Sequence, residues 1–131
     1  MVKSIELDQI VDGLKNTSSI SNIVSDRVFF WEPMYEQDWQ YIVLNSVSQI
    51  VDRVSKQALI EVRIIWNDEN VLKRDLVKTA NTITDVLVSE NPKTFWTFQY
   101  YKCVEWGGFR IFVDDKNRNI LIKDFIFYFL S

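Results

Sequence analysis

The stretch ALIEVRIIWNDENVLKRDLVKTANTITDVLV, residues 58–88, places a strand pattern directly before a helix pattern. Apolar side chains alternate from Ile60 to Trp66, which predicts a strand with one apolar face. From residue 69 to 88 they recur at intervals of three and four, which predicts a helix capped by Asp68 and ended before Pro92. A strand that leads into a long amphipathic helix favours an α+β fold in which the helix covers a sheet.

The flanking segments extend this arrangement. On the N-terminal side we expect a helix near residues 4–14 and strands at 28–31 and 41–47. Between them we expect an irregular polar link over 17–26, which leaves room for one helical turn around Ile20, Ile23 and Val24. On the C-terminal side we expect a long aromatic strand at 95–106, a bulge or bend at Gly107-Gly108, a continuation at 109–113, a polar turn at 114–119 and a closing strand to residue 130.

The predicted fold class is therefore α+β, a two-layer domain formed by residues 1–131. It has an antiparallel or mixed sheet of about five to six strands, with two helices packed on one face. Residues 48–57 contain neither glycine nor proline and retain Ile50, Val51 and Val54. We expect the flanking strands to continue through them as a projecting hairpin arm.

Residue counts exclude several kinds of site. The chain has no histidine and one cysteine, Cys103, which excludes Cys/His zinc sites, Ser-His-Asp and Cys-His catalysis, and intramolecular disulfides. We therefore assign no catalytic, cofactor-binding or metal-binding residue, and we expect a protein that is not an enzyme and uses no cofactor.

The remaining polar or reactive features have structural interpretations. Asp124 in the closing strand is expected to face solvent or pair with an arginine rather than to act in catalysis. The turn at 114–119 lacks the glycine and the closing glutamate of a calcium loop, and Gly107-Gly108 lacks the flanking residues of a phosphate-binding loop. Cys103 is expected to be a buried, inert thiol.

The charge distribution argues against a nucleic-acid-binding protein. The net charge is −3, and the fifteen basic residues are scattered, with Lys73-Arg74 as the only adjacent pair. The first residues become polar at once, and the apolar run at 120–130 is interrupted and too short to span a bilayer. We expect a cytoplasmic protein that does not contact a membrane.

Aromatic residues make up 15% of the chain and point to assembly. Met34, Tyr35 and Trp39 fall in a predicted loop, where large apolar side chains must either fold over the sheet or bind a partner. Rings alternate on both faces of the strand expected at 95–106. We interpret this pattern as a surface shared with other chains.

The layout of the chain resembles the tail terminator or tail-completion family of tailed phages. The resemblance lies in the Arg27-Val28 entry to a strand, the strand beginning Tyr41-Ile42-Val43-Leu44, the strand at 60–66 that leads into the helix at 69–88, and the three closing strands. The aromatic content is heavy for that family, which leaves room for an additional partner.

The resemblance implies a structural virion protein that forms a homo-oligomeric ring, commonly a hexamer. Such a ring caps the tail tube, joins it to the head–neck connector, and lets DNA pass through its lumen without specific binding. Assembly would take place in the host cytoplasm and the finished ring would lie at the head–tail joint of the virion. We assign the subunit interfaces to seven residues: Trp31, Tyr35, Trp39, Gln49, Asp52, Arg53 and Arg110.

Two other classes of function remain open from the sequence. One is an NTF2-like pocket protein that binds a small apolar ligand or performs acid-base chemistry with Asp124 or Tyr101. The other is a small acidic immunity or inhibitor protein that binds a basic toxin.

Overall fold

The computed structural model describes residues 4–35, 37, 39–51, 55–68 and 73–130. Within these residues the elements follow in the order α1 (Ser4–Lys15), α2 (Ser18–Val24), β1 (Val28–Phe30), β2 (Tyr41–Val51), β3 (Ser55–Trp66), α3 (Lys73–Leu87), β4 (Lys93–Phe95), β5 (Phe98–Tyr100), β6 (Lys102–Val113) and β7 (Asn119–Leu130). The predicted α+β class is confirmed.

Five of the strands form one mixed sheet in the order β1-β2-β3-β7-β6. β1 runs parallel to β2, and the other neighbours are antiparallel. The closing strand β7 lies inside the sheet and pairs with β3 from Ser55↔Leu130 to Trp66↔Asn119. β4 and β5 form a separate small hairpin.

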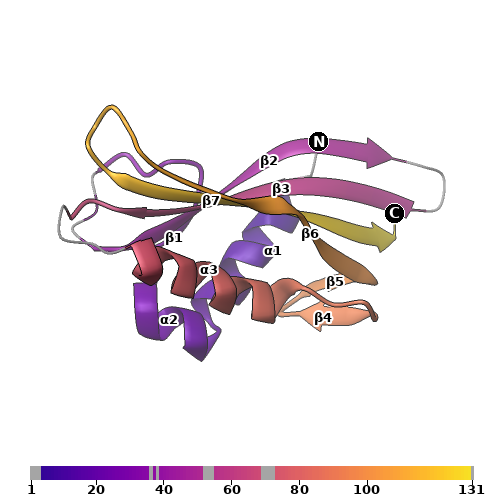
Figure 1. Cartoon of the computed structure of the whole chain (residues 1–131). Helices are drawn as coiled ribbons and strands as arrows, with labels where there is room; N and C mark the ends of the chain where they lie inside the picture. The colour runs from indigo at the N-terminus through magenta and orange to yellow at the C-terminus, as the bar shows by residue number, and fades with distance from the viewer. Residues whose placement is uncertain (1–3, 36, 38, 52–54, 69–72, 131) are drawn as a thin grey trace.

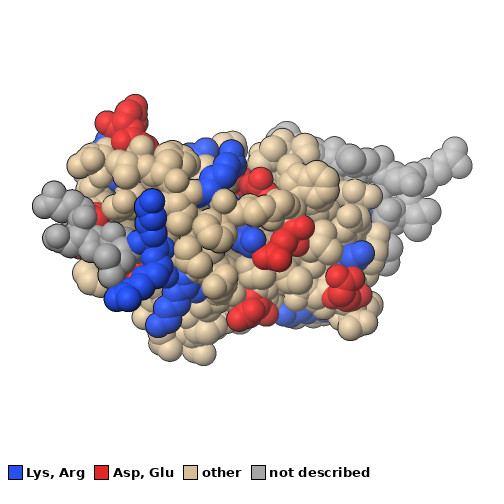
Figure 2. Space-filling model, in the orientation of Figure 1, with Lys and Arg blue, Asp and Glu red and all other residues tan. Residues whose placement is uncertain are grey.

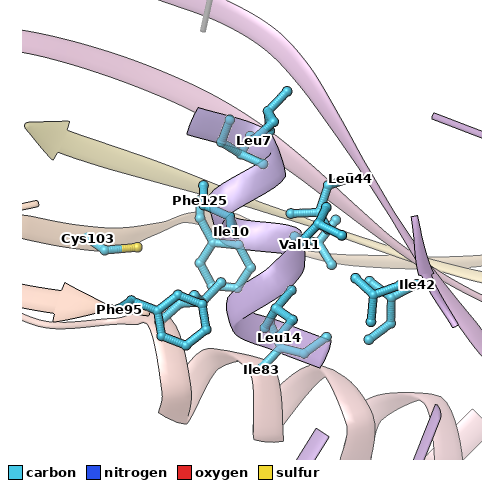
Figure 3. Close-up of a cluster of buried hydrophobic side chains, with 14 of the residues drawn as sticks. Leu7, Ile10, Val11, Leu14, Ile42, Leu44, Ile83, Phe95, Cys103 and Phe125 are labelled. Atoms are coloured by element: carbon cyan, nitrogen blue, oxygen red, sulfur yellow. The ribbon is translucent and has the colours of Figure 1, made fainter. Parts of the chain in front are cut away.

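The helices all lie on one face of the sheet (Figure 1). The buried side chains of α1 are Leu7, Ile10, Val11 and Leu14. Those of α3 are Leu76, Thr79, Ala80, Ile83 and Leu87. They pack against the odd-numbered side chains of β7, among them Leu121, Phe125 and Phe127, as Figure 3 shows for Phe125. Residues 69–72, the expected start of the second helix, lie outside the described residues.

In place of the irregular link expected at 17–26, with its single helical turn, the structure has a third helix, α2, of seven residues, so the count of two helices was wrong. Its sequence, SSISNIV, has weak helix propensity. Ile20 and Val24 are four residues apart, share one side of the helix and are fully buried. Because α2 packs against α1 and α3, tertiary burial decides its conformation.

The single strand expected at 95–106 was also wrong. Trp96 has a φ of +58°, and the chain reverses at Trp96-Thr97 so that Phe95 pairs with Phe98. The Phe98 and Tyr100 rings then pack 5.7 and 5.1 Å from the Phe127 ring. Most of the rings that we interpreted as lying on two faces of one strand therefore fill the core.

Three local expectations are borne out by the strand pairing. The register of β6 against β7 shifts between Trp106 and Phe109, so Gly107-Gly108 forms a bulge, and Gly107 has a φ of +73°. The polar segment at 114–118 is the β6–β7 turn, closed by a 3.0 Å bond from the Asn117 N–H to the Asp114 carbonyl. Strands β2 and β3 continue into the expected arm.

The arm is not a free hairpin, however, because β7 runs beside β3 as far as Ser55↔Leu130 (Figure 1). No helix in the described part of the chain has the length and apolar content needed to cross a membrane.

Gly13 is required by close packing between α1 and the β4–β5 hairpin. A Cβ at this position would lie 2.9 Å from Cδ2 and Cζ of Phe95 and closer still to Cε2. Gly→Ala in a helix interior normally stabilises by about 1 kcal/mol. Here we expect Gly13→Ala to destabilise the protein by about 1–3 kcal/mol, because the buried Phe95 ring must move.

Urea unfolding of the variant and the wild type measures this difference. Asn22→Ala, at an exposed position of α2, is the matched control and should change the free energy of unfolding by less than about 0.5 kcal/mol. Gly13→Ala should be less harmful in a Phe95→Leu background. Equal effects in both backgrounds would contradict the proposed steric cause.

Candidate interaction site

The loop between β1 and β2 carries three of the residues that the sequence assigned to an interface. β1 ends at Phe30, one residue earlier than expected, and Trp31 has a φ of +68°, which is rare for a bulky side chain. The Trp31 ring lies 5.3 Å from the Phe30 ring, and at the other end the Trp39 ring lies 5.3 Å from the Trp66 ring. Both ends of the loop are therefore held by aromatic contacts.

Most of the apolar surface of this loop faces solvent. The exposed fractions are 58% for Trp31, 93% for Met34, 78% for Tyr35 and 52% for Trp39. Large apolar side chains displayed on a fixed loop are typical of a protein interface, because aromatic groups bury much area with little loss of conformational entropy.

A buried arginine fixes the start of the loop. Arg118, in the turn before β7, donates from Nη1 to Oε1 of Glu32 at 2.5 Å and to Oη of Tyr41 at 2.8 Å. Its Nε donates to Oδ2 of Asp114 at 2.8 Å. Asp114 also accepts the backbone N–H groups of Lys116 and Arg118 through Oδ1. The network joins the loop, β2 and the β6–β7 turn.

The electrostatics of this network follow from partial burial. Burial alone would raise the pKa of Asp114, but the hydrogen bonds and charge of Arg118 outweigh it, so the pKa of Asp114 lies below its ordinary value. Burial raises the pKa of Tyr41 to about 12 despite the nearby Arg118 cation. For Arg118, burial would lower the pKa, but the carboxylates of Glu32 and Asp114 raise it above the ordinary value. The network therefore holds a permanent cation between two carboxylates.

A hollow of about 380 Å³ adjoins the network, lined by Glu32, Pro33, Met34, Tyr35, Tyr41, Lys116 and Arg118. Arg118 is already shared between Glu32 and Asp114. The charge of Arg118 is therefore already balanced within the protein. A second hollow of about 380 Å³ lies beside β4 and β5, lined by Pro92, Lys93, Thr94, Gln99, Tyr100 and Tyr101.

The sheet face opposite the helices is buried at only one end. The buried side chains there form a small cluster of Tyr41, Val43, Ile65, Ile120 and Ile122. Beyond it the face becomes polar, and Glu61 of β3 lies opposite Asp124 of β7. Burial and the Glu61 carboxylate raise the pKa of Asp124, while Arg110 and Lys123 oppose this shift.

Asp124 lines neither of the two hollows, so the geometry gives no support to the acid-base role considered for it. The space that an NTF2-like protein would use, between sheet and helices, is filled by side chains such as Leu7, Leu14 and Phe125, each fully buried (Figure 3). Among the described residues, no group of three or more acidic or cysteine side chains is placed to hold a metal ion.

The other assigned interface residues lie apart from the loop. Arg110 is exposed on the edge strand β6, opposite Ile122 of β7. Gln49 lies in the arm, in β2 opposite Ala58. Asp52 and Arg53 lie outside the described residues. Of the assigned residues that the structure describes, Trp31, Tyr35 and Trp39 thus lie in the loop, Gln49 in the arm and Arg110 on the edge strand.

Two features were missed by the sequence reasoning. Trp106, Phe109, Phe112 and Val113 are 57%, 46%, 41% and 57% exposed on β6. The sequence pattern around these residues predicts a strand but does not indicate whether that strand lies inside the sheet or at its edge. The pairing of Arg118 with Glu32, 86 residues away, has no local signal either.

Comparison with known proteins gives a match in fold. No protein-family model and no curated protein sequence matches the chain. A solved structure described as "Virion of native gene transfer agent (GTA) particle" contains a similar chain, with a TM-score of 0.68 and 13% sequence identity. The superposition covers 95% of this chain and 93% of that chain. The two chains therefore share a fold over nearly their whole lengths.

The surface charge is mixed. On the face shown in Figure 2, acidic and basic side chains are interspersed, and basic groups gather over the first turns of α3. Lys73, Arg74 and Lys78 are exposed there, as expected for a solvated helix face.

The network around Arg118 predicts a pH-dependent contribution to stability. The pKa of Asp114 is lower in the folded protein than its ordinary value of 3.8. The Asp114 carboxylate therefore contributes fully to the free energy of unfolding above pH 3.8, and this contribution is lost as the pH falls through the lowered pKa. We expect Asp114→Asn to reduce the free energy of unfolding by about 1–3 kcal/mol at pH 7, and by clearly less near pH 3.

Denaturant unfolding at the two pH values measures this effect. Asp115→Asn, at an exposed position of the same turn, is the control and should have a small effect at both pH values. If Asp114→Asn lowers the free energy of unfolding equally at both pH values, the stability does not come from the charge interaction between Asp114 and Arg118.

The burial of Cys103 predicts low thiol reactivity. Its side chain is fully buried, and burial raises its pKa to about 12, although the Lys93 cation opposes the shift. At about pH 8 we expect a disulfide reagent to modify the native thiol at least about a hundredfold more slowly than the thiol of the denatured protein. Cys103→Ser gives the background rate. Rapid reaction of the native thiol would contradict the packing of β6 against β7.

Proposed function

We propose that this chain is a structural protein of a phage-like particle and acts as a tail terminator. In this role it assembles into a ring that caps the tail tube and joins it to the head–neck region. The observation that carries the proposal is the likeness in fold to a chain of a gene transfer agent virion, which extends over nearly the whole of both chains.

The exposed side chains support a role in assembly. Closed rings use heterologous contacts, in which two different patches of one subunit meet those of its neighbours. The loop with Trp31, Tyr35 and Trp39 supplies one accessible patch. Arg110 and the arm that contains Gln49, Asp52 and Arg53 are the other proposed contact regions. A hexamer is the expected ring, with the tail tube protein and the head–neck connector as its neighbours.

The charge of the chain is compatible with DNA passing through such a ring. Affinity for DNA comes mainly from phosphates that are neutralised by clustered lysine and arginine. A net charge of −3 with interspersed signs favours passage without specific binding. We accordingly place the protein at the head–tail joint of the virion, after assembly in the host cytoplasm.

The test is the assembly state of the purified protein, alone and with its tail tube protein, by light scattering and negative-stain electron microscopy. We expect rings, or rings at the ends of tubes. The double substitution Met34→Ser/Tyr35→Ser should weaken association by at least about tenfold, because it removes the two most exposed apolar side chains of the loop.

Trp96→Asn is the matched control, since Trp96 is also exposed and its positive φ suits asparagine. This variant should assemble like the wild type. A wild-type protein that stays monomeric and never caps tubes would overturn the proposal.

A further inference from the structure

The free edge of β6 is the most unusual surface of the described molecule. β6 ends the strand order, so its neighbour within the sheet is β7. Near its start, the Ser89 backbone covers the edge by bonding to the N–H and the carbonyl of Cys103. In the described residues, no further backbone contact of this kind is made from residue 105 to 113. This part of the edge presents backbone groups that can pair with another strand.

The exposed side chains of this edge are mostly apolar. Natural edge strands are usually protected by lysine, proline or inward-facing charge. Here the exposed positions include Trp106, Phe109, Phe112 and Val113, on both faces of the strand. Such an edge is an aggregation hazard in a free protein unless a partner covers it.

Gly108 independently indicates that another chain approaches this edge closely. Gly107 is explained by its positive φ in the bulge, but Gly108 has no such conformation. A Cβ at Gly108 would meet no atom of the described residues within 4 Å. Nothing in the described protomer therefore requires glycine at this position. Glycine in a strand also marks places where another backbone approaches closely.

The charges favour a second copy of this chain as the partner. The exposed Glu105 carboxylate is paired with Nζ of the buried Lys123 at 2.7 Å. Arg110 lies exposed on the same face of the edge as Trp106 and Phe112. The loop sequence WEPMYEQDW, residues 31–39, has three carboxylates and no cation, and Arg118 pairs with one of them. The other two carboxylates, Glu36 and Asp38, lie outside the described residues, so the charge complementarity with Arg110 is a property of the sequence. The exposed rings of Trp31, Tyr35 and Trp39 match the aromatic character of the edge.

We infer that the β6 edge from residue 105 to 113 receives the aromatic loop of a second copy of this chain, with Gly108 admitting its backbone. The loop joins β1 to β2, and β6 lies at the other end of the strand order. The contact is therefore head-to-tail, the type that closes a ring. This inference rests on the proposed function and specifies its subunit interface.

The test compares Gly108→Lys with the wild type. The substitution fits the open space of the described protomer and places a lysine on the edge. We expect its melting temperature as a monomer to equal that of Asn22→Lys, an exposed position of α2, within about 2 °C. Its self-association, measured by light scattering, should be at least about tenfold weaker, while Asn22→Lys assembles normally.

A photo-crosslinking phenylalanine analogue in place of Phe112 identifies the partner in a mixture of isotopically light and heavy chains. Crosslinks between light and heavy chains should reach residues 31–39. Crosslinks from one β6 to another β6, or normal assembly of Gly108→Lys, would overturn this inference and leave the proposed ring intact. A wild type that never assembles would overturn both.

Discussion

The pairing of β7 with β3 is the constraint on which the rest of the structure depends. It joins all twelve residues of each strand and places β7, which is last in the sequence, inside the sheet between β3 and β6. Its register directs Leu121, Phe125 and Phe127 toward the helices, and Ile120 and Ile122 to the opposite face. A slip of one residue would exchange these two sets, so burial on both faces specifies the register strongly.

This central pairing also determines which surfaces remain for partners. The helices and the β4–β5 hairpin pack against one face, whereas the opposite face has its buried cluster near Tyr41 and Ile120. Arg118 immediately precedes β7, and its bonds to Glu32 and Asp114 tie the β1–β2 loop to the same end of the sheet. These bonds anchor Glu32 at the start of the loop, and anchoring of this kind lowers the entropy that a loop would lose on binding a partner. β6, which follows β7 in the sheet, becomes the exposed edge.

The successes and failures of the sequence predictions have separate physical causes. The alternation at 60–66 and the helical spacing at 73–87 are strong local patterns, and both elements were predicted correctly. α2 and the reversal at Trp96 were missed because their local preferences are weak and packing against the core decides them. Exposure of Trp31, Tyr35 and Trp39 agrees with the interface assignment, which remains a prediction. The Arg118 network has no local pattern, because its partners come together only on folding.

The sequence by itself determined the α+β class, the apolar face of the strand at 60–66 and the absence of histidine chemistry, because composition and hydrophobic periodicity are local properties. Only the tertiary structure decided which aromatic rings are core and which are free. Phe98 and Trp96 are two residues apart in one aromatic run, yet one is 4% and the other 54% exposed. The difference arises from a chain reversal and from the position of β7, and both depend on contacts between residues far apart in the chain.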